Sequence, residues 1–196
     1  MGKTIPSILL VLILGRTAMG DVHYVLPSGN HVFPFTTWDD AATNIQSCID
    51  AADSNDTVLV GDGVYLLSEG ISIERPLNLQ GANGANHAIV DGGGQVRCFH
   101  VLSPGVRIEG LTIQNGFSDM TGGGILAQAP ADIISCRLLS NSGRDCYCWV
   151  VAHPDWQFKG SGGGVGLLDG GTISNCLFVG NFGSANAFEA SGGGAF

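Results

Sequence analysis

The sequence predicts an all-β fold in which short strands stack coil upon coil into a solenoid, with one helix at its amino-terminal end. Glycine accounts for 31 of the 196 residues, more than double the usual share of about 7 %. A repeat runs through the second half, and several segments alternate apolar and polar residues as half-buried strands do. Hydrophobic residues make up 44 % and charged residues only 13 %, a balance that argues against a disordered acidic chain.

The amino-terminal segment predicts export. Lys3 precedes an apolar run over residues 8–14, and the segment closes on small residues at Ala18 and Gly20, the pattern that a signal peptidase reads. Arg16 interrupts the apolar stretch well before the roughly 20 residues that a membrane-spanning helix needs. We therefore expect residues 1–20 to be a signal peptide and the mature protein to be secreted, extracellular, or on the cell surface or outer membrane.

Residues 21–56 are expected to hold a strand and a capping helix. Residues 37–52 carry apolar side chains at helical spacing, which predicts one amphipathic helix. Thr36 or Thr37 would cap its first turn, and Asp39 and Asp40 would lie near the positive end of the helix dipole. Such a helix would cover the apolar layer that the first coil otherwise exposes.

Coils are expected over residues 57–196. The segments 57–60, 70–74, 77–80 and 107–109 alternate apolar and polar residues, as strands with one buried face do. Glycine-rich clusters separate them and can supply the positive φ that tight corners require. The five histidines are scattered along the chain and are expected to be surface or turn residues rather than ligands.

Glycine triplets mark the repeat, at residues 122–124, 162–164 and 192–194. After the first two triplets, the shift from Cys136 to Cys176 equals the shift from Asn141 to Asn181. A further copy without a triplet lies upstream and ends at Asn115. The register therefore predicts that the three asparagines line up and pass amide hydrogen bonds from coil to coil.

The same register predicts an inward stack of Cys136 over Cys176, with Gly110 in the same slot of the preceding coil. Six cysteines in an exported chain are compatible with disulfides. Buried free thiols are an equally good interpretation, because side chains in register point in parallel rather than towards each other. Both interpretations stay open at this point.

The order of these elements resembles pectate-lyase-like right-handed parallel β-helices. The resemblance rests on the predicted helix followed by residues 56–65, 71–82 and 89–94. The glycine triplets, together with the sequence FVGN at 178–181, are similar to the GGA[ILV] and FxxN repeats of polymorphic outer-membrane proteins. The chain stops at the opening of a new coil, so we expect it to be truncated at its carboxyl end and to self-associate through the open coil.

The resemblance implies binding or cleavage of polysaccharide along one side of the stack. The step from the first triplet to the second is longer than the step from the second to the third, which indicates an insertion near 144–159. This insertion carries Tyr147, Trp149 and Trp156, whose rings are candidates for stacking on sugars. The alternative is that these aromatic side chains fold the insertion into a small satellite core.

Catalysis would need a further set of residues. A lyase of this fold uses a lysine or arginine base and carboxylates that hold calcium, for which the candidates are Lys159 and Arg144. No acidic cluster suggests a metal site, and calcium would be implied only if the protein is an enzyme. No other cofactor is indicated.

These patterns favour a non-catalytic scaffold for adhesion or glycan binding. The partner would be an extracellular polysaccharide or a glycan of the host or cell surface. A polysaccharide lyase, hydrolase or epimerase is the alternative. Because 17 acidic residues outnumber 8 Lys and Arg and give a net charge of −9, a nucleic-acid partner is not expected.

Overall fold

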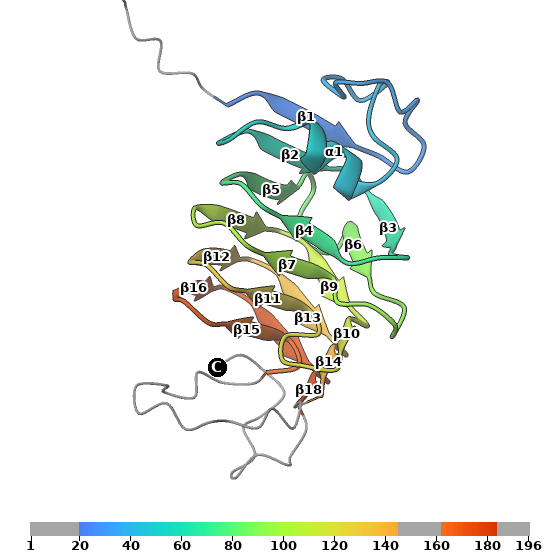
Figure 1. The fold of residues 1–196 in the computed structure, drawn as a ribbon. Helices are drawn as coiled ribbons and strands as arrows, with labels where there is room; N and C mark the ends of the chain where they lie inside the picture. The colour runs from blue at the N-terminus through green and yellow to red at the C-terminus, as the bar shows by residue number, and fades with distance from the viewer. Residues whose placement is uncertain (1–19, 145–161, 184–196) are drawn as a thin grey trace, which may run out of the picture.

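The computed structural model describes residues 20–144 and 162–183, which form a stack of short strands with one short helix at one end (Figure 1). The helix is α1 (Ile45–Ala51). The strands are β1 (Val22–Val25), β2 (Thr57–Val60), β3 (Gly63–Leu66), β4 (Ile71–Ile73), β5 (Asn78–Gly81), β6 (Ala88–Asp91), β7 (Phe99–Val101), β8 (Val106–Glu109), β9 (Thr112–Gln114), β10 (Phe117–Ser118), β11 (Ile125–Ala127), β12 (Ala131–Ile134), β13 (Arg137–Leu139), β14 (Ser142–Gly143), β15 (Val165–Leu167), β16 (Gly171–Ser174), β17 (Leu177–Val179) and β18 (Phe182–Gly183).

The described strands form four sheets. Sheet A has the order β1-β2-β5-β8-β12-β16, sheet B β3-β6-β9-β13-β17, sheet C β4-β7-β11-β15 and sheet D β10-β14-β18. The chain visits sheets A, B and C in turn and then returns to A. Each of the last three passages also adds a strand to sheet D after its strand in sheet B. We call one such passage a layer. Every strand pair is parallel, so the predicted all-β, parallel class is confirmed for this part of the chain.

The register between layers follows the sequence repeat where the glycine triplets mark it. Leu138 pairs with Phe178, and Ile125 pairs with Val165. The constant shift that the sequence shows between the two copies is therefore the register of the last two layers. The strands expected near 57–60, 70–74, 77–80 and 107–109 are present as β2, β4, β5 and β8.

The core runs along the inside of the stack, because alternate side chains of each strand point inward. In β8, for example, Val106 and Ile108 are buried while Arg107 and Glu109 are partly exposed. Apolar side chains of successive layers stack on one another, as Leu79, Ile108 and Ile133 do in sheet A. Each layer thus buries its apolar side chains against its neighbours.

Left-handed backbone turns the chain at two corners of each later layer. Between sheets A and B the positive φ falls on Gly110, Ser135 and Asn175, which follow paired strand ends. A second series after sheet B has positive φ at Asn115, Ser140 and Gly180. The positive φ expected at the corners is present, but it falls on serine and asparagine residues in addition to glycines.

The predicted helix over residues 37–52 is wrong in its amino-terminal half. Helix α1 begins at Ile45, after an Asn44 cap whose Oδ1 accepts from the Ser47 N–H at 2.8 Å. Thr37 caps a separate turn instead, since its Oγ1 accepts from the Asp40 N–H at 3.1 Å. Ala42 forms an isolated parallel bridge to Val25 of β1. This backbone pairing with β1 replaces the first turns of a helix, and no acidic residue lies in the first turn of α1.

The amino-terminal end of the stack is covered by β1 and α1 together. Strand β1 pairs with β2 and extends sheet A by one strand. Helix α1 packs against β1, β2 and β4, with Ile45, Cys48 and Ile49 buried (Figure 1). No helix among residues 20–144 and 162–183 is long and apolar enough to cross a membrane. The predicted signal peptide lies outside the described residues except for Gly20.

Candidate functional site

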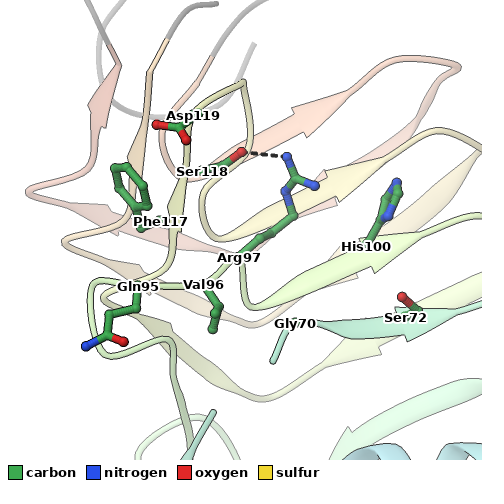
Figure 2. Close-up of a pocket in the computed structure, with 9 residues that line it drawn as sticks. All are labelled: Gly70, Ser72, Gln95, Val96, Arg97, His100, Phe117, Ser118 and Asp119. Carbon is green, nitrogen blue, oxygen red and sulfur yellow. Dashed lines mark hydrogen bonds between the residues drawn. The ribbon is translucent and has the colours of Figure 1, made fainter. Parts of the chain in front are cut away.

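A pocket of about 360 Å³ lies on the outer side of sheet C, where the chain passes from β6 to β7 and from β10 to β11 (Figure 2). Its lining is polar and charged with one aromatic ring. The lining residues are Gly70, Ser72, Gln95, Val96, Arg97, His100, Phe117, Ser118 and Asp119. We call this the Arg97 pocket. Its volume lies within the range of small-ligand sites, about 300–1,000 Å³.

The floor of the Arg97 pocket comes from the strand alternation of sheet C. Ser72 of β4 pairs with His100 of β7. Their chain neighbours, such as Ile73 and Phe99, are fully buried. Because side chains alternate between the two faces of a strand, Ser72 and His100 point outward. Two polar side chains from adjacent layers are therefore placed side by side beneath the pocket.

Arg97 joins this floor to the wall formed by residues 117–122. Its Nε donates to the Gly122 carbonyl at 2.9 Å, and its Nη2 donates to Ser118 Oγ at 2.7 Å and to the Thr121 carbonyl at 3.2 Å. Figure 2 shows the guanidinium extended towards Ser118. Within the described part of the chain Nη1 makes no hydrogen bond, so Arg97 keeps donors for a ligand.

His100 lies beside this cation. Burial lowers the pKa of His100, the charge of Arg97 lowers it further, and a hydrogen bond with Gln128 opposes both effects. Its Nε2 is buried and has no hydrogen-bond partner among the described residues. We therefore expect a neutral imidazole at pH 7. Burial also lowers the pKa of the Arg97 guanidinium.

The predicted insertion leaves and rejoins the described chain beside this pocket. Before it, the Arg144 N–H donates to the Ser118 carbonyl at 2.8 Å, and the Arg144 guanidinium lies 5.6 Å from the centre of the Phe117 ring. After it, the Gly162 carbonyl accepts from the Gly122 N–H at 2.9 Å. The described residues on both sides of the insertion are thus hydrogen-bonded to residues 117–122. The candidates Tyr147, Trp149, Trp156 and Lys159 lie outside the described residues.

The asparagine ladder forms between Asn141 and Asn181. Asn141 Nδ2 donates to Asn181 Oδ1 at 2.9 Å and to the Ile113 carbonyl at 2.9 Å. Asn141 Oδ1 accepts from the Gly116 N–H at 2.8 Å. Asn181 repeats both roles one layer on, accepting from the Asn141 N–H at 3.0 Å and donating to the Leu138 carbonyl at 2.8 Å.

The prediction that Asn115 belongs to this ladder is wrong. The strand register sets Thr112 beside Arg137, so Asn115 aligns with Ser140 and its neighbour Gly116 aligns with Asn141. Asn115 Nδ2 instead donates to the Asp91 carboxylate at 3.0 and 3.1 Å. The spacing between Asn115 and Asn141 in the sequence is one position longer than the strand register.

The same offset of one position corrects the cysteine stack. Leu111, not Gly110, occupies the position that aligns with Cys136. Cys136 and Cys176 are in register as predicted, and the Cys136 N–H donates to Cys176 Sγ at 3.4 Å. Both thiols are free, as are Cys48 and Cys98. The interpretation as free thiols therefore holds for these four, and Cys146 and Cys148 lie outside the described residues.

The histidines are not uniformly surface or turn residues. His23 is buried in β1, and His100 lies on β7 at the pocket. Residues 20–144 and 162–183 contain no group of three or more His, Cys, Asp or Glu side chains that could hold a metal ion. Arg144 is the one catalytic or ligand-binding candidate from the sequence that lies within the described residues. Its guanidinium lies over the ring of Phe117, which lines the Arg97 pocket.

The pocket residues Gln95, Arg97, His100, Phe117 and Asp119 were not expected from the sequence. The signal that could have indicated them is a polar residue at the centre of a short apolar strand, such as His100 between Phe99 and Val101. Comparisons with protein-family models, with curated proteins and with solved structures find no match to this chain.

Proposed function

We propose that this chain is an exported right-handed parallel β-helix that binds an extracellular polysaccharide or a cell-surface glycan at the Arg97 pocket, as a non-catalytic scaffold for adhesion. The observation that carries the proposal is the pocket itself, in which charged and polar side chains surround the Phe117 ring. The handedness is inferred from the parallel strands, since crossovers between parallel strands are right-handed in about 98 % of cases.

The chemistry of the pocket suits a sugar. Hydroxyl groups both donate and accept, and they need partners of both kinds. Arg97 supplies donors, Asp119 supplies acceptors, and Gln95 and Ser118 supply both. Phe117 offers an apolar face for the C–H side of a ring. The predicted export of the chain would place this pocket where extracellular glycans are found.

Glycan binding is tested with the full chain on an array of acidic and neutral polysaccharides, followed by calorimetry with the best ligand. We expect Gln95→Ala and His100→Ala to weaken affinity at least tenfold, since each removes a pocket side chain without disturbing the Arg97 hydrogen bonds. The control is Gln80→Ala, on the outer face of sheet A, and it should bind as the wild type does. Equal affinity in all three variants would exclude the Arg97 pocket.

A polysaccharide lyase is the second candidate, favoured by the neutral imidazole of His100 beside the Arg97 cation. A neutral imidazole can accept a proton next to a uronate carboxylate that a cation holds. The test incubates the chain with uronate polymers and calcium and follows the ultraviolet absorbance of unsaturated products. Product that is lost in His100→Gln would establish a base in this pocket. Product lost only in Lys159→Ala would place the base in the insertion, and no product would favour the scaffold.

A further inference from the structure

A buried histidine and a buried carboxylate meet where the amino-terminal strand joins the stack. His23 of β1 is 5 % exposed and Asp56, directly before β2, is 6 % exposed. His23 Nε2 lies 3.2 Å from Asp56 Oδ2, and His23 Nδ1 lies 2.7 Å from the Pro34 carbonyl oxygen. The pair therefore connects β1, the loop that follows it and the residue that leads into β2.

Both ring nitrogens of His23 face acceptors. The Pro34 carbonyl can only accept, so Nδ1 must carry a proton. Asp56 is held as a carboxylate, because its Oδ1 accepts from the Asp21 N–H at 2.7 Å and its Oδ2 accepts from the Asp53 N–H at 2.6 Å. Nε2 then also needs a proton to bond Oδ2. A neutral ring would direct a lone pair at the carboxylate instead.

The carboxylate is stabilised by its surroundings. Burial alone would raise the pKa of Asp56, but hydrogen bonds from Asp53, Asp21 and His23 and the charge of His23 outweigh burial and lower that pKa. The other ionisable residues of these segments, Asp21 and Asp53, reach Asp56 through their backbone N–H groups. In the loop, His31 packs against the Phe35 ring at 5.2 Å.

We infer that His23 and Asp56 form a proton-dependent latch that holds β1 and the 32–35 loop on the edge of β2. The latch is closed when His23 is an imidazolium and Asp56 is a carboxylate. The charged hydrogen bond from Nε2 to Asp56 exists only in the imidazolium, so it is lost when the ring gives up its proton. The contribution of Asp56, whose pKa is lowered, is present above about pH 3.9 and is lost as the pH falls further.

The latch has a structural consequence at the sheet edge. Strand β1 pairs with β2 along residues 57–60, and Thr57 N–H donates to the Asp21 carbonyl at 2.8 Å. When Nε2 loses its proton, the repulsion between its lone pair and the carboxylate loosens this pairing. The edge of β2 then becomes available to another strand.

The test measures hydrogen exchange of the full chain at about pH 5.5 and about pH 8.5, on either side of the ordinary histidine titration, with rates corrected for intrinsic pH dependence. We expect protection of residues 21–26 and 57–60 to fall at least tenfold at the higher pH, while residues 106–109 keep theirs. His23→Gln should abolish the difference. The control His87→Gln should retain it, because His87 lies 3.5 Å from Asp62 in a pair that is about half exposed.

A second measurement does not depend on any variant folding. Nitrogen-15 spectra of the His23 ring in the wild-type chain should show both ring nitrogens protonated at about pH 5.5. A singly protonated ring at that pH, or equal protection of β1 at the two pH values, would overturn the latch. Because neither readout involves a glycan, failure of the latch and failure of the proposed binding function are separate outcomes.

Discussion

At the scale of single residues, Asn141 is the side chain that most clearly ties one layer to the next. It is fully buried, and its amide satisfies the Ile113 carbonyl and the Gly116 N–H of the preceding layer. Asn181 performs the same two functions one layer further on. The side-chain amide thus supplies hydrogen bonds to backbone groups that would otherwise have no partner at this corner.

We expect Asn141→Ala to lower the free energy of unfolding by about 3 kcal/mol, because it leaves a buried N–H and a buried carbonyl without partners. Urea denaturation followed by circular dichroism measures the change. The matched control is Asn83→Ala, whose exposed amide bonds Asp62 at 2.9 Å. It should cost less than about 0.5 kcal/mol. Equal effects of the two substitutions would refute the assigned role of Asn141.

How far the sequence predicts single residues depends on the register. Asn141, Asn181, Cys136 and Cys176 are predictable because the spacing that the two pairs share is the true register between layers. Asn115 is not, because matching asparagine to asparagine across a layer without a glycine triplet shifts the alignment by one position. A shift of one position turns a side chain to the other side of the backbone. Asn115 therefore bonds Asp91 rather than Asn141.

At the scale of elements, close backbone approach explains the glycines of the triplets at 122–124 and 162–164. A Cβ on Gly123 would lie 2.1 Å from the Ser142 carbonyl oxygen, and one on Gly163 would lie 2.0 Å from that of Phe182. A Cβ on Gly124 would meet the Asn141 amide at 3.0 Å. The triplets and the asparagines therefore recur together because both occupy one crowded corner.

The prediction for this corner compares two glycines. Gly123→Ala should lower the free energy of unfolding by about 3 kcal/mol or more, because backbone on the next layer must move. Gly84→Ala should cost only about 1 kcal/mol, because that position has open space and only its positive φ opposes a side chain. Thermal or urea unfolding of both variants checks this ranking, and the reverse order would show that contact at Gly123 is relieved cheaply.

Elements are predicted unevenly from this sequence. The strands follow from alternation, which is a local signal. The first turns of the predicted helix do not form, because Ala42 pairs with Val25 of β1. Helical spacing alone does not reveal that competing backbone partner. The Arg97 pocket cannot be predicted from local sequence patterns either, since β4, β7 and residues 117–119 contribute to it from three layers. Its residues come together only once the register is known.

At the scale of the whole molecule, the two ends of the described stack differ. The amino-terminal end is covered by β1 and α1. At the other end, β15, β16, β17 and β18 each pair on one side only within the described residues. Large apolar side chains are exposed there, with Leu177 at 48 %, Val179 at 51 % and Phe182 at 60 %. Unpaired strand edges beside apolar side chains are surfaces on which another chain can pair.

We therefore expect the protein to self-associate through β17 and β18, with light scattering that reports a dimer or larger species. Val179→Lys and Phe182→Lys together should shift it towards monomer, because charged side chains disfavour edge pairing. The control is Val64→Lys, at the opposite edge of sheet B, where Val64 is 58 % exposed, and it should leave the association unchanged. A strict monomer whose residues 173–181 are as protected from hydrogen exchange as residues 71–79 would show that this end of the stack needs no partner.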